Sequence, residues 1–356
     1  MSRTQSDLEQ PRPRRPKGSR RASGCLSPIA TGWALGLTVP LLLLAWAQAA
    51  DTVGPAPLLI AYAALPWLLP IAGLLALALA FPARSRLAWL ATLALIGVYV
   101  WRYGHVWWPN EKAEATGGVV LRVMAFNIGD QRVTAEEVIA FVHAENPDLV
   151  SIEELNPYTA AALNQGLADL WPHQALDFNS PSTGLFSKYP LASAEFVPTP
   201  GNRPYLRADL DLNGAPVHVF AMHPSAPDVV FRETVPIGIN DQRPRAQLVA
   251  TAELVRTLTG PRIMLGDFNM SDQSPGYAQV TRGLRDAFAE AGFGPGFTWP
   301  VANSRNTLRR WGWGTPFPLV RIDYILHSDE FAAVDARVNC ESNSDHCFIV
   351  ADLSLR

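Results

Sequence analysis

The sequence predicts an α/β fold in which mixed β-sheets pack as a sandwich flanked by helices, preceded by three helices that cross a membrane. In residues 119–356, short strand-like runs alternate with amphipathic helical patterns. Two alternating runs are joined by Asn213-Gly214, the strongest short hairpin signal, which adds antiparallel strands to the sheets. The membrane helices are predicted from three long apolar stretches that contain very few charges.

Composition divides the 356 residues into four expected parts. Residues 1–25, rich in Arg, Pro and Ser, are expected to form a disordered basic cytoplasmic tail. Residues 26–108 form a three-span membrane domain, residues 109–118 a linker, and residues 119–356 the catalytic domain.

The three apolar stretches, Leu26–Ala50, Ala56–Phe81 and Leu87–Trp108, are each close to the ~20 residues that a membrane-spanning helix needs. Basic residues lie before the first stretch and between the second and third, at Arg84 and Arg86, whereas the loop between the first and second carries only Asp51. The positive-inside rule therefore predicts a multi-pass protein of the cell membrane, with a cytoplasmic N-terminus and an extracytoplasmic catalytic domain. A cleaved signal peptide ending near residues 47–49 is the alternative, although two more spans would still follow it.

The charge of the catalytic part bears on its partners. Residues 117–356 contain 18 Lys and Arg against 27 Asp and Glu, a formal net charge of −9. A nucleic-acid-binding domain usually shows a basic surface, so nucleic acid is a partner that the charge does not favour. The lipid bilayer around the three spans is an expected partner, and no protein partner can be inferred.

Local signals place the elements of the catalytic part. A capping box at Thr134 and Glu137 starts one helix, Asn156-Pro157 starts another, and Gly260 ends a third. In chain order we expect strands at Val119–Phe126 and Asp148–Ile152, helices opening at Thr134 and Asn156, strands at 183–187, 205–212 and 217–223, a long polar loop at 224–241, a helix at 245–258, and strands at 263–265, 321–326 and 347–355.

Polar side chains recur where these strands end. Asp267 and Asn269 follow one strand with a single residue between them, so both point to the same side. Asp323 lies inside an apolar run, where an unpaired carboxylate would be costly, and a histidine is its natural partner. The other strand-end residues are Asn127, Glu153, Glu154, His223, Ser344, Asp345 and His346. Their recurrence predicts a single shared site.

Taken in order, these motifs resemble those of the endonuclease/exonuclease/phosphatase superfamily. The matching segments are Asn127 after a strand, Ile152-Glu153-Glu154, the run from Thr183 to Leu191, Met222-His223-Pro224, Gly266-Asp267-Phe268-Asn269, Ile322-Asp323-Tyr324 and Ser344-Asp345-His346. The resemblance covers residues 119–356 and implies a four-layer α/β sandwich of two mixed sheets flanked by helices. It says little about the substrate.

The resemblance also implies catalytic roles. Asp267 corresponds to the residue that orients or activates the attacking water. Asn269 and His223 correspond to groups that steady the phosphate or the leaving group. His346 corresponds to a phosphate contact that is held in place by Asp323, and such a pair favours the imidazolium form.

The metal site is implied in the same way. Glu154 corresponds to the family's metal-binding glutamate, with Asn127 and Asp345 on the same side of the site. Hard oxygen ligands suit Mg²⁺ or Mn²⁺ as the cofactor. Two positions depart from the usual pattern. Glu153 replaces a glutamine, and its carboxylate either adds charge at the metal or faces away from it. Gly129 replaces a polar residue, for which Asp130 is a potential substitute.

Two further groups of residues leave alternatives open. Cys340 and Cys347 bracket the last motif, and they are either a disulfide outside the cytoplasm or two unrelated buried thiols. Aromatic and basic residues precede the Asp323 strand and either contact substrate or simply pack a loop. They are Trp299, Trp311, Trp313, Phe317, Arg305, Arg309 and Arg310.

The function predicted from these observations is a membrane-anchored, divalent-metal-dependent phosphoesterase that hydrolyses a phosphomonoester or phosphodiester outside the cytoplasm. A nuclease acting there on DNA or RNA is the first alternative, and the acidic charge disfavours it. A non-catalytic binding module on the same fold is the second, and the nearly complete set of motifs disfavours it.

Overall fold

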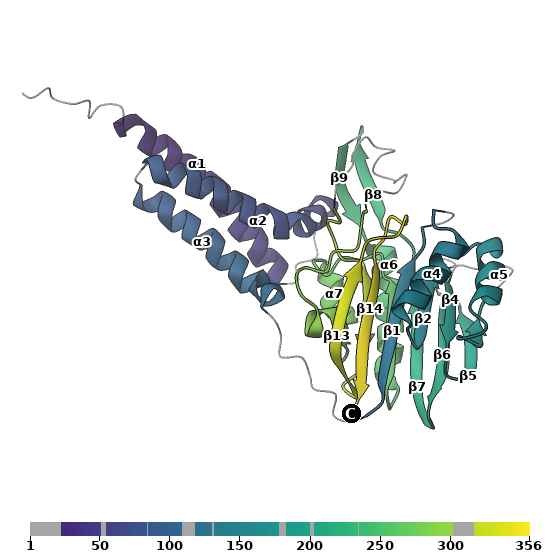
Figure 1. Cartoon of the computed structure of the whole chain (residues 1–356). Helices are drawn as coiled ribbons and strands as arrows, with labels where there is room; N and C mark the ends of the chain where they lie inside the picture. Colours follow the sequence, from purple (N-terminus) through teal and green to yellow (C-terminus); the bar gives the residue numbers. More distant parts are fainter. Residues whose placement is uncertain are drawn as a thin grey trace, which may run out of the picture.

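The computed structural model describes residues 23–50, 55–83, 85–108, 118–129, 132–177, 183–199, 203–233, 235–301 and 317–356. It consists of an N-terminal bundle of helices and a β-sandwich domain (Figure 1). Most of the predicted tail, residues 1–22, and most of the predicted linker, residues 109–117, lie outside the described residues.

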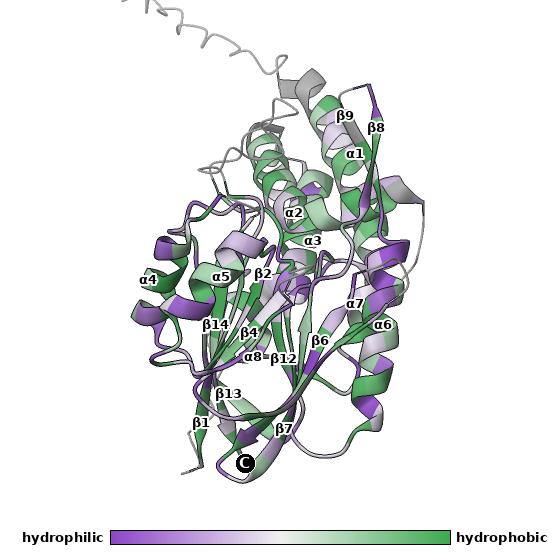
Figure 2. Ribbon diagram, turned by 90° about the vertical axis from the view of Figure 1, so that its right-hand side faces the viewer, coloured by the Kyte–Doolittle hydropathy of each residue, from purple (hydrophilic) through white to green (hydrophobic). Residues whose placement is uncertain are grey.

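The N-terminal bundle contains three helices, α1 (Ser23–Ala49), α2 (Ala56–Ala83) and α3 (Arg86–Tyr103), followed by a short 3₁₀ turn, η1 (Gly104–Trp107). Each helix is long and apolar enough to cross a membrane, as predicted, and Figure 2 shows that all three are hydrophobic along most of their length. The helix α1 already includes residues 23–25, which the sequence analysis assigned to the N-terminal tail. The bundle core contains Tyr62, Leu65 and Leu95, which are fully buried.

The β-sandwich consists of two mixed, six-stranded sheets. The first has the strand order β13-β14-β1-β2-β4-β3, and the second has the order β11-β12-β10-β7-β6-β5. The strands β1 and β2 are parallel, as are β7 and β10, and the other pairs are antiparallel. The bounds of the strands are β1 (Val120–Asn127), β2 (Leu149–Glu153), β3 (His173–Ala175), β4 (Thr183–Ser187), β5 (Leu191–Val197), β6 (Tyr205–Leu212), β7 (Ala215–Met222), β10 (Arg262–Asp267), β11 (Arg285–Asp286), β12 (Asp323–His327), β13 (Phe331–Asn339) and β14 (Phe348–Leu355).

Helices cover both outer faces, which gives the four layers that the sequence predicted. On the first sheet, α4 (Ala135–Glu145) and α5 (Pro157–Gly166) bury a cluster that includes Phe126 and Phe186. On the second, α6 (Gln242–Thr257) and α7 (Pro275–Val280) bury a cluster that includes Phe220 and Met264. A third cluster fills the space between the sheets, where α8 (Ala287–Ala291) also packs.

Several local predictions are confirmed. Thr134 and Glu137 form a reciprocal capping box at the start of α4, and the Asn156 side chain caps α5. Asn213 and Gly214 have φ values of 56° and 90° and turn β6 into β7, because a tight hairpin turn needs left-handed backbone at both positions.

The prediction of a long polar loop at residues 224–241 is wrong. This segment contains a separate two-stranded hairpin of β8 (Asp228–Arg232) and β9 (Val235–Asn240). Pro236 and Gly238 interrupt the apolar run of β9, and both residue types weaken a strand pattern, which is why the signal was missed. Figure 1 shows this hairpin standing at the end of the sandwich from which the N-terminal bundle extends.

Candidate active site

The predicted site residues gather at one edge of the sandwich. The parallel strands β1 and β2 end at this edge with Asn127 and Glu153, and β7 and β10 end there with Met222 and Asp267. The antiparallel strand β12 begins at the same edge, where Asp323 lies opposite Asp267 in the register. The loop before β14 adds the remaining members of the cluster. Strand direction alone therefore brings side chains from both sheets to one place.

The side-chain amide of Asn127 joins two carboxylates from different sheets. Its Nδ2 donates to Asp267 Oδ2 at 2.9 Å and makes a longer contact of 3.4 Å with Glu154 Oε1. Its Oδ1 accepts a hydrogen bond from the Gly129 N–H at 2.9 Å, which fixes the orientation of the amide. Asn127 and Asp267 are buried, whereas the Glu154 side chain is one-third exposed. Glu154 is thus the member of this group that solvent reaches.

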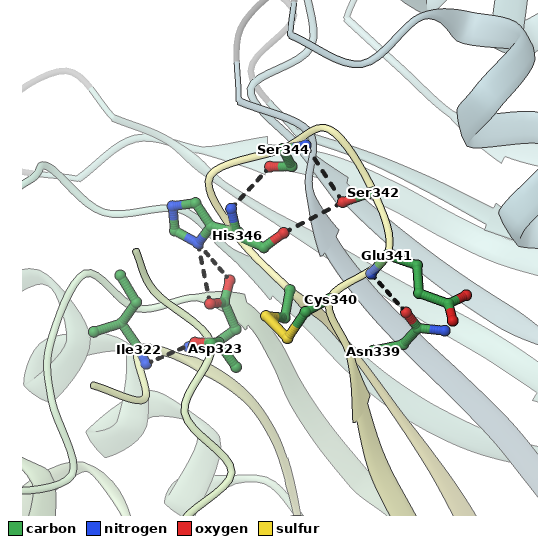
Figure 3. Close-up of a disulfide and its surroundings, with 10 residues drawn as sticks. Ile322, Asp323, Asn339, Cys340, Glu341, Ser342, Ser344 and His346 are labelled. Carbon is green, nitrogen blue, oxygen red and sulfur yellow. Dashed lines mark hydrogen bonds and ion pairs between the residues drawn. A yellow bond between two sulfur atoms is a disulfide. The ribbon is translucent and has the colours of Figure 1, made fainter. Parts of the chain in front are cut away.

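Asp323 and His346 form the buried pair that the sequence predicted (Figure 3). His346 Nδ1 lies 3.0 Å from Asp323 Oδ2 and 3.2 Å from Oδ1, and its Nε2 lies 3.9 Å from Asp267 Oδ2. Burial alone would lower the pKa of His346, but the charges of Asp323 and Asp267 outweigh this effect and raise the pKa to about 10. The imidazole is therefore cationic at neutral pH, with one N–H on Asp323 and the other facing Asp267.

Asp267 lies at the centre of the cluster and accepts hydrogen bonds on both oxygens. Its Oδ1 accepts from the Asn269 backbone N–H at 2.7 Å. Burial raises its pKa, the cation of His346 lowers it and the charge of Asp323 raises it again, which leaves the pKa at about 7. A carboxylate with a pKa near neutrality is suited to accept a proton from water.

His223 is the second histidine of the cluster and stays neutral. Burial, with the positive charges of Arg203 and His346, lowers the pKa of His223 to about 3. Its Nδ1 lies 3.3 Å from Arg203 Nη1, and a guanidinium can only donate, so Nδ1 accepts and Nε2 carries the proton. That Nε2 is 3.8 Å from both Glu154 Oε1 and Asp267 Oδ2. His223 therefore presents an uncharged N–H donor to the centre of the site.

Two residues of the site have left-handed backbone conformations. Glu154 has φ 60° and Asn269 has φ 50°. Asn adopts this region readily, whereas Glu does so rarely, and such strain persists only where the surroundings enforce it. The Asn269 side chain donates to the Pro224 carbonyl at 3.1 Å, which ties the loop after β10 to the loop after β7.

Glu153 explains one departure from the family pattern. Its side chain is completely buried, and one carboxyl oxygen is hydrogen-bonded to Ser151 Oγ. Burial raises the pKa of Glu153 well above its usual value, Ser151 lowers it, and the charges of Asp323 and Asp267 raise it further. These effects together favour the protonated form, in which the carboxyl group resembles the amide that it replaces. Gly266 has to be a glycine here, because a Cβ would meet Met222 O and lie 2.9 Å from Glu153 Oε1.

Asp345 and Gly129 lie side by side at the border of the site. Asp345 Oδ2 is 2.6 Å from Arg132 Nη1, so this carboxylate is engaged by a cation that the sequence reasoning did not identify. A Cβ at residue 129, where φ is 65°, would lie 2.7 Å from Asp345 Oδ1, so the backbone and the neighbour both favour glycine. Asp130, the suggested substitute ligand, lies outside the described residues.

The donor atoms suit a hard divalent cation. Carboxylate oxygens of Glu154 and Asp267 both lie within 3.4 Å of Asn127 Nδ2, and carboxylate oxygens suit Mg²⁺ or Mn²⁺. In this orientation Asn127 presents its N–H group to them, so it would offer Oδ1 to a cation only with its amide turned over. Asp267, Asp323 and His346 form a second group whose ligand atoms all lie within 4.8 Å of one another. The Asp323–His346 hydrogen bond already uses one nitrogen of that group, which leaves the Glu154 side better suited to a cation.

Cys340 and Cys347 form a disulfide, with an S–S distance of 2.01 Å and a sequence separation of seven residues (Figure 3). The bond closes the loop that carries Asp345 and His346. Within this loop Ser344 Oγ donates to the Asn127 carbonyl at 2.7 Å and accepts from the His346 N–H at 3.0 Å. The loop is thus attached to β1 and held closed by a covalent bond.

The aromatic and basic residues that precede β12 are only partly described. Trp299 makes a β-bridge with Val320, and the Phe317 ring packs against Trp67 of α2. For these two residues the structure shows a packing role. The other members of the group lie outside the described residues. They are Arg305, Arg309, Arg310, Trp311 and Trp313.

Known proteins with the same fold support this description. The chain is similar to truncated TDP2 from Caenorhabditis elegans, with 18% identity, a TM-score of 0.53 and coverage of 66% of this chain and 98% of that one. It is also similar to a conserved protein of unknown function from Enterococcus faecalis V583 (15% identity, TM-score 0.53, coverage 66% and 100%). Zebrafish (D. rerio) TDP2 complexed with a single-strand DNA product gives 17% identity, a TM-score of 0.51 and coverage of 66% and 98%. No curated protein matches the chain.

The family profile matches residues 124–346, which begin within β1 and end at His346. This segment contains every strand-end residue that the structure gathers at the edge of the sandwich. Members of this family typically hydrolyse phosphoester bonds. The chain belongs to the endonuclease/exonuclease/phosphatase family.

Proposed function

We propose that the protein is a membrane-anchored, divalent-metal-dependent phosphoester hydrolase whose site faces the outside of the cytoplasm. The observation that carries the proposal is the grouping around Asp267. A carboxylate with a pKa of about 7 lies between a cationic histidine and a neutral one, next to the more exposed Glu154. A base, a cation and an uncharged hydrogen-bond donor are the groups that hydrolysis of a phosphate ester needs.

Glu154 would hold the cation through its carboxylate, with Asp345 at the border of the same side. Asn127 would join it through Oδ1 once its amide is turned over from the orientation that bonds the Gly129 N–H. When bound there, Mg²⁺ or Mn²⁺ stabilises negative charge on the phosphoryl oxygens. The exposure of Glu154 supports this assignment, because a substrate phosphate has to approach a cation at Glu154 from solvent.

The chain's own residues would carry the proton transfer and the charge stabilisation. Asp267 orients a water molecule and accepts its proton, for which a pKa of about 7 is suitable. The His346 imidazolium, held by Asp323, donates a charge-assisted hydrogen bond to the phosphate. His223 donates through Nε2, and its low pKa keeps this nitrogen available as a donor without an added positive charge.

The extracytoplasmic location has two supports that are independent of each other. Arginines precede the first apolar stretch and also lie between the second and third, with Arg86 at the start of α3. The positive-inside rule predicts that both groups are cytoplasmic. The Cys340–Cys347 disulfide belongs in an oxidising compartment. We therefore keep the multi-pass topology with a cytoplasmic N-terminus and the division of the chain at residues 25, 108 and 118 as parts of the proposal.

The proposal is tested with the full-length chain purified in detergent. We expect hydrolysis of bis(p-nitrophenyl) phosphate or p-nitrophenyl phosphate with Mg²⁺ or Mn²⁺, loss of the activity in excess chelator, and recovery when metal is restored. Glu154→Gln should lower the rate by about tenfold or more. Glu195→Gln, which changes an exposed glutamate on β5, is the matched control and should leave the rate unchanged. Undiminished wild-type activity in excess chelator would contradict the metal-dependent mechanism.

A further inference from the structure

Three segments that adjoin the candidate site also touch the N-terminal helices. The first follows β10, shortly after Asn269. Gln48 Nε2 donates to the Gln273 carbonyl at 3.3 Å and to its Oε1 at 3.1 Å, and Tyr103 OH donates to the same Oε1 at 3.1 Å. The end of α1, the end of α3 and the loop after Asp267 are therefore joined by one set of hydrogen bonds.

The second segment precedes β12, whose first residue is Asp323. Trp67 of α2 donates from Nε1 to the Leu319 carbonyl at 3.0 Å. Its ring packs against Phe297 and Phe317, with centroid distances of 5.3 and 5.2 Å. This segment thus lies against the side of a predicted membrane helix.

The third segment is the β8–β9 hairpin, which begins shortly after His223. The strand β9 packs along α2, and Ile239 joins the buried cluster that contains Leu59 and Tyr62. Figures 1 and 2 both show the hairpin at the end of the sandwich next to the bundle. The edge of the sandwich that carries the site is therefore the edge that docks on the bundle.

The depth of the hairpin follows from the connectivity. Because α3 leads into the β-sandwich domain, this domain lies on the side of the membrane where α2 begins. The apolar part of α2 runs from Pro57 to Phe81 over 25 residues, about 37 Å at ~1.5 Å per residue, which exceeds the ~30 Å hydrocarbon core. The first turns of α2, with Leu59 and Tyr62, therefore lie in the headgroup layer or at its border, and β9 lies beside them.

The hairpin exposes apolar side chains at this depth. Val230, Val235 and Ile237 are 40%, 50% and 38% exposed. The hairpin belongs to neither large sheet, and an isolated two-stranded hairpin is marginally stable in water. The membrane helix on one side and lipid on the other would supply the apolar contacts that it lacks.

We propose that the β8–β9 hairpin rests in the headgroup layer of the adjacent leaflet, and that the site hydrolyses the phosphodiester headgroup of a phospholipid in that leaflet. This inference rests on the proposed function and specifies its substrate class. Only residues 224–227 separate His223 from β8, so lipid contact at the hairpin brings the site close to the level of the headgroups. Water's oxygen forms a new bond to phosphorus and the P–O bond to one alcohol breaks. That alcohol leaves with one proton of the water, and the other proton is released as the phosphomonoester ionises.

The test compares a lipid with a soluble substrate. The full-length chain is reconstituted in vesicles of phosphatidylcholine, phosphatidylethanolamine and phosphatidylglycerol in equal parts, and lipid products are measured by mass spectrometry. In parallel, bis(p-nitrophenyl) phosphate is assayed. We expect the V230S/V235S/I237S variant to lose about tenfold or more of the phospholipid rate while keeping its rate on the soluble ester. The control V120S/L170S removes exposed apolar side chains elsewhere on the domain and should keep both rates.

The outcomes separate this inference from the proposed function. Hydrolysis of the soluble ester without any hydrolysis of vesicle phospholipid overturns the inference and leaves the proposed function standing, whereas inactivity on both substrates counts against both. Wild-type phospholipid hydrolysis by the hairpin variant overturns the role of the hairpin. A second measurement does not depend on activity: an environment-sensitive dye at Val235→Cys, in a Cys25→Ser background, should show blue-shifted emission in vesicles relative to the dye at Val120→Cys. Equal emission from the two sites would also overturn the role of the hairpin.

Discussion

His346 Nδ1 lies 3.0 Å from Asp323 Oδ2, although Asp323 belongs to the second sheet and His346 lies in a loop that leads into the first. Asp323 begins β12 of the second sheet, and His346 ends the loop that leads into β14 of the first. The hydrogen bond thus connects the sheets at the edge where the candidate site lies. Both side chains are buried, so each charge depends on the other for compensation.

The titration of His346 predicts a pH dependence of stability. The folded-state pKa, about 10, lies above the ordinary value of 6.5, so protonation of His346 stabilises the fold. This contribution is fully present below about pH 6.5 and is lost as the pH rises through about 10. We expect the melting temperature in detergent to fall over this window in the wild type, and to fall less in Asp323→Asn, where the partner charge is absent. Identical slopes for the two proteins would contradict the assigned charge state.

A carboxylate in an apolar strand needs a partner, and the family resemblance supplied His346 as that partner. The other strand-end residues were predicted because the strand periods were clear. Arg203 precedes β6 and Arg132 follows β1. Both were missed, because the loops that contain them carry no sequence pattern of their own. Glu153 was left undecided between a charged ligand and a side chain facing away. Burial between the sheets raises the pKa of Glu153, and this burial depends on tertiary packing and not on local sequence.

The elements of the fold were predicted where local sequence signals are strong and missed where they are weak. Strong signals such as Asn213-Gly214 and the capping box of Thr134 placed β6, β7 and α4, whereas the edge strands β5 and β13 and the β8–β9 hairpin were missed. Edge strands are half-exposed and lack a clean apolar alternation, as in Leu191–Val197. The contact of Gln48 with Gln273 joins residues that are far apart in the chain, so no local pattern could reveal how the domain docks on the bundle.

A substitution at Glu153 tests the role of this buried carboxyl group separately from that of the more exposed Glu154. Glu153→Gln keeps the shape and removes an ionisable group whose pKa is raised by burial, so hydrolysis should stay close to the wild-type rate. A raised carboxyl pKa costs stability as the pH rises above the unfolded-state value, so the variant should melt at a higher temperature at pH 8, with a smaller gain at pH 5. Loss of activity equal to that of Glu154→Gln would show that the Glu153 charge is needed.

Removal of the disulfide should loosen the loop that carries His346. We expect the Cys340→Ser/Cys347→Ser double variant to lose about 2 kcal/mol of stability and to hydrolyse substrate more slowly, because the position of His346 depends on this loop. Thermal unfolding in detergent and the rate on a soluble phosphoester provide the two readouts. Unchanged values in both would mean that the hydrogen bonds of Ser344 hold the loop unaided.

The orientation of the chain in the membrane can be measured directly. A reporter that is active only after export, fused after Trp108, should be active, and a reporter that is active only in the cytoplasm should not be. The bond between Cys340 and Cys347 gives a second readout, since both cysteines should resist alkylation in intact cells until a reductant is added. A cytoplasmic readout from both reporters would reverse the proposed topology.

The most direct test of the candidate site is a double-mutant cycle on Asp323 and His346 in phosphoester hydrolysis. Asp323→Asn keeps the shape but removes the charge that favours the imidazolium, and His346→Ala removes the imidazole, so each should lower the rate by about 10²-fold or more. Because the two act as a unit, the double variant should be little slower than either single variant, with folding intact by circular dichroism. Small losses that add fully in the double variant would contradict the pairing and the mechanism that depends on it.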